Sequence, residues 1–198
     1  MKKAMKLVWM VLLALPMISL TSCGDDDDTI MDDNGVEVQF KDYSNLLGKT
    51  MTDILNKEMK DYTPEMFEDG SGMVYYSDDQ DLGENVFYVS PSFWLYGADE
   101  EVVYQSEKSV MVLEEVYGFE KQAMYNHFSS KYGDATMLSD GTYEFTKGNM
   151  YIWLDYISKN EIDIYYVNKS DYDKYVRETK GTDSVAAIKK ALKAHVVK

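Results

Sequence analysis

The chain has 198 residues, with 20 Lys and Arg against 35 Asp and Glu, so its formal net charge at neutral pH is −15. A charge of this sign argues against nucleic acid as a partner and against docking of the folded part on anionic lipid. The length suits one domain or two small ones, and a single cysteine excludes an internal disulfide.

The first 22 residues have the anatomy of a secretory signal peptide. Three lysines lie within the first six positions, and a short apolar run follows over residues 7–18. This run is too short to span a bilayer comfortably. Removing residues 1–22 removes three lysines and no acid, so the mature chain would hold 17 basic and 35 acidic residues, a net charge of −18.

The end of this leader, Leu20-Thr21-Ser22-Cys23, resembles the lipobox of bacterial lipoproteins. The resemblance implies cleavage just before Cys23 and attachment of a diacylglycerol to it. The acidic run that follows resembles the export signal of Bacteroidetes-type surface lipoproteins and consists of Asp25, Asp26, Asp27 and Asp28. It implies a protein anchored in the outer membrane through lipid on Cys23 and exposed on the cell surface.

Residues 23–35 are predicted to form an acidic tether, because they contain almost nothing to bury. The Asp-x-Asp-x-Asp-Gly spacing of a calcium loop is absent, so the tether is not expected to hold a metal. The folded part is then expected to begin at residue 36.

Residues 36–118 are predicted to form a first helix-plus-strands unit. Thr50 to Asp53 is a plausible capping box, and apolar residues follow it at helical spacing. Thr63-Pro64 is typical of the start of a second short helix. Strands are expected over residues 73–76, 86–89, 93–96, 102–105 and 110–117.

Residues 119–170 are predicted to form a second unit of the same kind. A helix is expected over 120–132, ended by Gly133. Asp140-Gly141 and Lys159-Asn160 indicate tight turns. The strands that these turns would join are expected over residues 135–138, 142–146, 150–158 and 161–168.

The predicted fold class is therefore α+β, with helices followed by antiparallel strands twice along the chain. The two helices begin about 70 residues apart, a spacing compatible with a small repeated unit. The pattern predicts either two helix-plus-antiparallel-sheet units, a possible tandem repeat, or one continuous sheet with helices on one face. A C-terminal helix completes either arrangement.

A local pattern in the second unit resembles the αβ-meander modules of the beta-lactamase inhibitor protein family and of small outer-membrane assembly lipoproteins. It consists of Phe128-x-x-Lys131-Tyr132-Gly133 followed by Tyr151-x-Trp153. The resemblance implies, as an alternative function, a protein inhibitor or an outer-membrane assembly accessory.

Residues 171–198 are predicted to form a C-terminal helical segment. From Ser184 onward it carries four lysines and no acid, with apolar residues at helical spacing, and Asp183-Ser184 is a good helix start. One interpretation is a terminal helix that docks on the acidic body. The other is a basic amphipathic helix that contacts a membrane or a partner.

Few residues in the chain suggest catalysis. The two histidines lie far apart and no thiol would remain free, which argues against a zinc site or a Cys–His nucleophile, and no cofactor or metal is predicted. A hydrolase using paired carboxylates stays open as an alternative, because acids are abundant. Asp155 interrupts an apolar strand and must face water or be paired.

The last two strands of the second unit supply the candidate binding face. Alternation places Tyr151, Trp153 and Asp155 on one side of their strand, with Tyr165 on the same side of the next strand. If helices cover only the opposite side, this face is open to a protein or glycan ligand. The alternative is that the other unit or the C-terminal segment covers it. The sequence thus predicts a lipid-anchored surface protein with a non-catalytic binding role.

Overall fold

The computed structural model describes residues 27–31, 37–58, 64–66, 73–76, 86–94, 102–118, 121–178 and 184–196. Cys23, Asp25 and Asp26 lie outside these residues, so the lipidation and export predictions are not tested by the fold. Among the helices described, none has both the length and the apolar character needed to cross a membrane.

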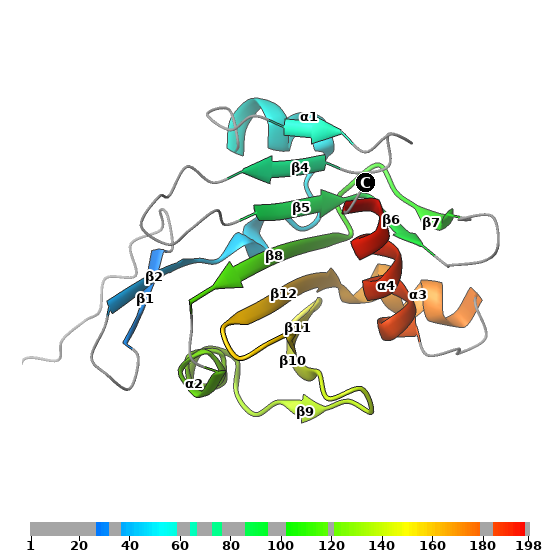
Figure 1. The fold of residues 1–198 in the computed structure, drawn as a ribbon. Helices are drawn as coiled ribbons and strands as arrows, with labels where there is room; N and C mark the ends of the chain where they lie inside the picture. Colours follow the sequence, from blue (N-terminus) through cyan, green and yellow to red (C-terminus); the bar gives the residue numbers. More distant parts are fainter. Residues whose placement is uncertain are drawn as a thin grey trace, which may run out of the picture.

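Runs of strands alternate with helical segments along the chain (Figure 1). The strands are β1 (Asp27–Met31), β2 (Glu37–Lys41), β3 (Pro64–Met66), β4 (Met73–Tyr76), β5 (Val86–Ser90), β6 (Ser92–Trp94), β7 (Val102–Gln105), β8 (Met111–Tyr117), β9 (Thr136–Met137), β10 (Tyr143–Lys147), β11 (Met150–Tyr156) and β12 (Glu161–Asn168). The helical segments are η1 (Tyr43–Leu46), α1 (Met51–Asp53), η2 (Ile54–Glu58), α2 (Lys121–Tyr132), α3 (Lys169–Glu178) and α4 (Ser184–Val196).

An eight-stranded antiparallel sheet forms the centre of the molecule, in the order β3-β4-β5-β8-β12-β11-β10-β9. Its first four strands follow α1 and η2 in the sequence, and its other four follow α2. The two sets meet where β8 pairs antiparallel with β12. The α+β prediction, with helix-plus-antiparallel-sheet units and a C-terminal helix, is confirmed, and the units share one continuous sheet.

The spacing of equivalent elements shows how the second unit repeats the order of the first. The helices begin at residues 51 and 121, and the first strands at residues 64 and 136, which are offsets of 70 and 72. The last strands, β8 and β12, begin at residues 111 and 161, an offset of only 50. The first unit is thus 22 residues longer between its first and last strands. The starts of β5 and β8 lie 25 residues apart and those of β11 and β12 lie 11 apart, so the segment with the β6–β7 hairpin accounts for 14 of these residues.

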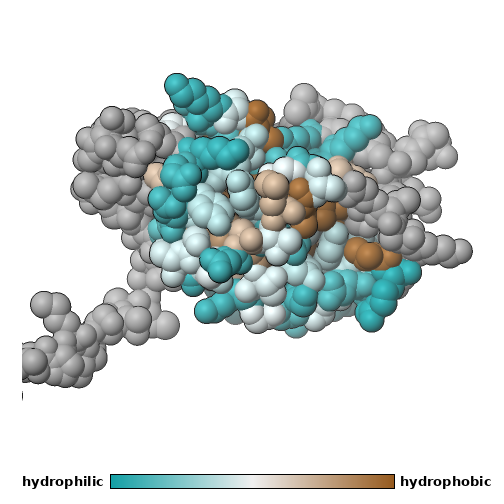
Figure 2. All heavy atoms as spheres, turned by 90° about the horizontal axis from the view of Figure 1, so that it is seen from below, coloured by the Kyte–Doolittle hydropathy of each residue, from teal (hydrophilic) through white to brown (hydrophobic). Residues whose placement is uncertain are grey.

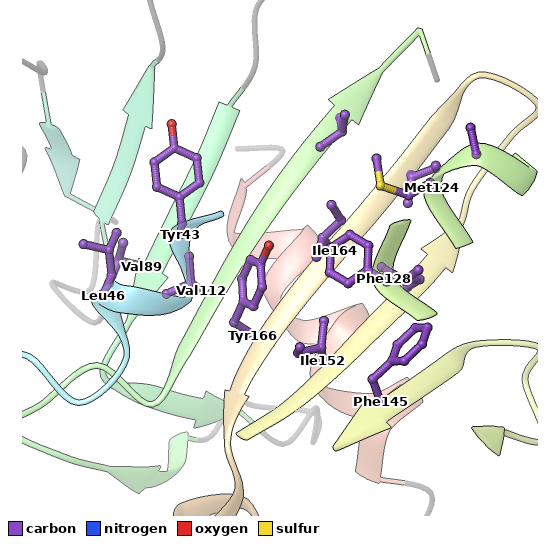
Figure 3. Packing of buried hydrophobic residues seen from close by; sticks show 14 of the residues in the cluster. Tyr43, Leu46, Val89, Val112, Met124, Phe128, Phe145, Ile152, Ile164 and Tyr166 are labelled. Atoms are coloured by element: carbon purple, nitrogen blue, oxygen red, sulfur yellow. The ribbon is translucent and has the colours of Figure 1, made fainter. Parts of the chain in front are cut away.

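One face of the sheet packs against α2, η1 and η2. Figure 3 shows side chains of α2 and η1 directed at side chains of the sheet, among them Met124, Phe128, Leu46, Ile152, Ile164 and Phe145. Residues at alternate positions of β11 and β12 supply the sheet side of this core, as expected for strands whose side chains alternate in direction.

The opposite face packs against α3, α4 and the β6–β7 hairpin. Its buried cluster joins Trp153 and Tyr165 of the sheet to residues of the three covering elements, namely Phe93, Trp94, Tyr175, Val185, Ile188, Ala191 and Leu192. Figure 1 shows α3 and α4 together, away from α2. The expectation that helices cover only one face is therefore wrong: this sheet has a core on each side.

Local sequence signals fixed several boundaries. The Thr50 hydroxyl accepts a hydrogen bond from the backbone N–H of Asp53 at 3.1 Å, which is the predicted N-cap. Gly133 adopts φ of 89° directly after α2, and its N–H donates to the Ser129 carbonyl. Gly141 adopts φ of 90° in the turn between β9 and β10, as the Asp140-Gly141 signal predicts.

Two local predictions are wrong. Pro64 does not start a helix; it is the first residue of β3, a strand at the edge of the sheet, where a missing backbone N–H is tolerated. Part of the predicted tether forms a strand as well, because β1 pairs antiparallel with β2. Asp27 and Asp28 of the acidic run are the first residues of β1.

Candidate functional site

The C-terminal helix α4 lies on the sheet through an apolar stripe. Val185, Ile188, Ala191 and Leu192 recur at helical spacing and are at most 8% exposed. The same side of α4 carries a lysine, Lys189, that is only 6% exposed. A lysine this deeply buried requires a charged or polar partner on the surface beneath it.

That surface contains three carboxylates in a line across the sheet. Asp155 on β11 lies directly opposite Asp163 on β12, and Asp163 lies directly opposite Glu115 on β8. Directly opposite residues have their Cβ atoms roughly 4.5–5.5 Å apart, and like charges at such positions repel. We call Asp155, Asp163 and Glu115 the acid row.

Two lysines of α4, four residues apart, reach this row. The Lys189 ammonium lies 2.7 Å from an Asp155 carboxylate oxygen and 3.1 Å from Asp140, which belongs to the turn before β10. It also donates to the Thr142 hydroxyl at 2.6 Å. The Lys193 ammonium lies 2.6 Å from Asp163. The interpretation of the tail as a terminal helix that docks on the acidic body is therefore confirmed.

Asp163 is the most enclosed member of the row, with an exposed fraction of 0%. One carboxylate oxygen contacts Lys193 and accepts from the Tyr165 hydroxyl at 3.4 Å. Its other oxygen, Oδ1, has no hydrogen-bond partner among the described residues. Desolvation raises the pKa of Asp163, although the hydrogen bond and charge of Lys193 act in the opposite direction.

Glu115 completes the row without a lysine within ion-pair distance in the described structure. Burial, followed by the charge of Asp163, raises the pKa of Glu115. Beside it, burial and the charges of Glu115 and Glu161 raise the pKa of Tyr117 to about 12, and the Tyr117 hydroxyl donates to Glu115 at 3.4 Å. The row therefore holds one more carboxylate than α4 has lysines in contact with it.

Replacing Glu115 with glutamine is expected to stabilise the fold at neutral pH by roughly 0.2–1 kcal/mol, the range for a cross-strand pair. The pKa of Glu115 is raised in the fold, so its protonated form is favoured there and stability declines as pH rises through that folded pKa. Glutamine does not titrate. The gain should thus vanish in urea melts below the ordinary glutamate range, and a gain that persists unchanged there would contradict this account.

The candidate binding face lies beneath the same helices. Trp153 and Tyr165 are each 0% exposed, and Tyr151 is half-buried. The prediction that this face is open is therefore wrong, and the alternative of cover by the C-terminal segment is correct. The physical reason is that α3, α4 and β6–β7 bury these rings in a second apolar core.

The Trp153 indole N–H and the Tyr151 hydroxyl both have polar partners within the structure. The Trp153 Nε1 donates to Glu144 at 2.9 Å, and the ring lies 5.1 Å from that of Tyr172. Lys169 lies over the Tyr151 ring, 3.9 Å from its centre, and also donates to the Tyr151 hydroxyl. These contacts are typical of a packed structural cluster, and they leave Trp153 unavailable as a surface anchor.

Asp155, the fourth predicted site residue, is neither outward-facing nor free, since it forms the ion pair with Lys189. Sequence reasoning singled out this carboxylate but missed the lysine that meets it, along with Asp163, Glu115 and Asp140. The sequence held part of this information. Lys189 and Lys193 are four residues apart and so share a helix face, and Asp155 and Asp163 lie on consecutive strands. What it lacked was the pairing register that joins them.

Few large apolar side chains are exposed among the described residues. The exposed large hydrophobic residues among those described are Tyr117, Met137 and Ile157. Figure 2 shows the face seen from below, where hydrophilic and neutral residues surround a few apolar areas, including one near the centre. Within the described part of the chain, no group of histidine, cysteine or acidic side chains is arranged to hold a metal ion.

Chemically, the acid row and the apolar side chains beside it form a surface that receives ammonium groups together with an apolar helix stripe. We call this surface, defined by the acid row with Trp153 and Tyr165, the helix seat. No protein-family model matches the chain, and no curated protein or solved structure matches it either.

Proposed function

We propose that the protein is a lipid-anchored protein of the outer cell surface with a non-catalytic binding role. The lipobox ending at Cys23 and the acidic run after it support the anchor and its outward orientation. The mature chain's net charge of −18 supports a basic or neutral partner over an acidic one.

The observation that carries the binding role is how the acid row is used. Asp155 binds the ammonium group of Lys189 at 2.7 Å, and Asp163 binds that of Lys193 at 2.6 Å. Both lysines belong to the same amphipathic helix, α4. Ammonium groups held by carboxylates in this way give an interface its orientation and selectivity. This face of the sheet therefore binds a basic helix within its own chain. Binding of this kind is molecular recognition and involves no chemical reaction.

A carboxylate-dependent hydrolase receives no support from the same residues. Glycoside hydrolysis needs two carboxyl groups facing a cleft that admits substrate, one protonated and the other ionised. Asp155 and Asp163 instead lie under α4, and both are occupied by its lysines. Asp155 and Asp163 could contact a substrate only after α4 had moved away from the sheet.

A protein inhibitor or outer-membrane assembly accessory is the second candidate, and one observation favours it. Four strands form each half of the eight-stranded sheet, and they follow a helical segment in the sequence. This is the element order of the αβ-meander modules that roughly residues 119–168 resemble. Proteins of this kind act by contact alone, so both candidates predict a binding partner and no turnover.

The anchor is tested by replacing Cys23 with alanine. We expect the variant to be lost from the membrane fraction, because Cys23 is the single cysteine to which the diacylglycerol can be attached. Its two acyl chains together supply the firm anchoring that one chain alone does not give. The measurement is cell fractionation followed by mass determination of the native protein, which should show acyl groups on Cys23.

Protease added to intact cells provides the test of orientation. The native protein should be digested while a periplasmic marker stays whole. A Cys23→Ala variant that still fractionates with membranes and keeps its leader would overturn the anchor, and a native protein protected from protease would overturn its surface exposure.

A further inference from the structure

The helix seat combines features that a purely structural core does not need. Beside Trp153 and Tyr165, which are wholly buried, lie three carboxylates in adjacent strands. Replacing a buried ion pair by apolar residues of similar volume is often neutral or stabilising, because desolvation of the charges offsets their attraction. Apolar residues at positions 155 and 189 are therefore expected to hold α4 about as firmly as the ion pair does.

What the charges supply is selectivity. Lys189 and Lys193 lie one helical turn apart, and their partners Asp155 and Asp163 lie directly opposite one another on neighbouring strands. A helix lacking two lysines at this spacing would leave the buried Asp163 and the partly exposed Asp155 unpaired, which is unfavourable. The seat therefore discriminates among helices by charge pattern as well as by apolar fit.

The seat also holds more negative charge than α4 neutralises. Glu115 forms no ion pair with α4 in the described structure, and Oδ1 of the buried Asp163 has no hydrogen-bond partner among the described residues. A helix with one further cation near Glu115 would satisfy the row more completely than α4 does. A basic helix with such an additional cation could therefore compete with α4 for this surface.

We propose that α4 is an internal ligand of the helix seat, and that a basic amphipathic helix of a partner protein binds there by displacing it. The proposal rests on the binding role proposed above and names its partner: a helix with lysines or arginines four residues apart beside an apolar stripe. While docked, α4 keeps the Trp153 and Tyr165 rings out of water. Displacement is therefore productive only when the incoming helix covers those rings as well.

The probe for this proposal is a labelled peptide with the sequence of residues 184–198, tested by fluorescence anisotropy against the full mature chain carrying alanine in place of Cys23. The native seat is occupied by α4, whose tether gives it a high effective concentration, so it should bind the peptide weakly. The chain variant Lys189→Gln/Lys193→Gln leaves the acid row intact and weakens the internal helix. It should bind the peptide at least tenfold more tightly.

Two matched controls define specificity. A peptide carrying the same two glutamines should bind the variant chain at least tenfold more weakly than the native peptide. A second chain variant, Leu192→Asp, weakens α4 through its apolar stripe and keeps both lysines, and it should also gain affinity for the native peptide. Hydrogen exchange should show that the amides of β11 and β12 stay protected in both variants.

Either of two results overturns the proposal. The first is that the sheet stays protected in both variants with no gain in peptide binding, which would show that the seat cannot accept a helix from another molecule. The second is that β11 and β12 lose protection together with α4, which would make α4 an integral part of the core. Because this measurement uses protein without lipid, its failure is distinct from a failure of the membrane and protease tests.

Discussion

Replacing Trp153 with alanine is expected to lower the free energy of unfolding by about 3–5 kcal/mol, the usual cost of removing a large aromatic side chain from a core. The side chain is 0% exposed and contacts the rings of Tyr151, Tyr165 and Tyr172. The cavity would lie between the sheet and its cover of α3 and α4, where rigid rings on several sides limit collapse. Urea melts followed by circular dichroism measure the loss.

The control variant is Trp153→Phe, which keeps an aromatic ring and removes the Nε1 donor to Glu144. Because Glu144 is only partly buried, water can replace that donor, and the variant should lose much less stability than the alanine variant. A loss below about 1 kcal/mol for Trp153→Ala would contradict a packed second core, since surface substitutions fall in that range.

Replacing Lys189 with methionine is expected to cost about 1–3 kcal/mol, the usual penalty for leaving polar groups without a partner. The lysine is buried, whereas the side chains of Asp155 and Asp140 are 23% and 27% exposed and stay partly hydrated. Methionine retains most of the apolar stem, so the loss comes from the carboxylates of Asp155 and Asp140 and the Thr142 hydroxyl, which share this one ammonium group. The measurement is the same urea melt at neutral pH.

A rescue separates charge from packing. The triple variant Lys189→Met/Asp155→Asn/Asp140→Asn removes the stranded charges and should recover most of the lost stability. The matched control is Lys57→Met, which breaks the exposed ion pair of Lys57 with Asp53 and should not measurably change the melt. No recovery in the triple variant would show that the lysine acts through its shape alone.

Strand faces in the second unit were predictable because one strand alternates cleanly. Ile152 and Leu154 point into one core and Trp153 into the other, as the period of two requires. The start of α4 at Ser184 was equally local, since Asp183-Ser184 precedes an apolar stripe. Signals of this kind need only the residues within a few positions of one another.

Whether the Trp153 face is open or covered depends on residues far away in the sequence. The cover comes from α3, α4 and Phe93 and Trp94 of the β6–β7 hairpin. Aromatic residues interspersed with acids look the same in sequence whether they meet a partner or a helix of their own chain. The Lys189–Asp155 pair has the same origin, because its members lie 34 positions apart and meet only through tertiary packing.

Pro64 shows a local signal that tertiary pairing overrides. Threonine followed by proline is a good helix start, yet pairing with β4 places Pro64 in an extended strand. The tether gives a second case, since strand pairing of β1 with β2 orders a segment that is poor in apolar residues. Composition predicts what a segment can bury, and it does not predict which strand lies beside it.

The two ends of the large sheet bear on aggregation. Its outermost strands are β3, three residues long and opened by a proline that cannot donate a hydrogen bond, and β9, only two residues long. Beyond β9, the end of β10 carries an exposed cation at Lys147. Short strands, proline and lysine at edges all hinder one sheet from extending into another. Copies of this chain held side by side at high density are therefore protected against joining edge to edge, although each contains a wide antiparallel sheet.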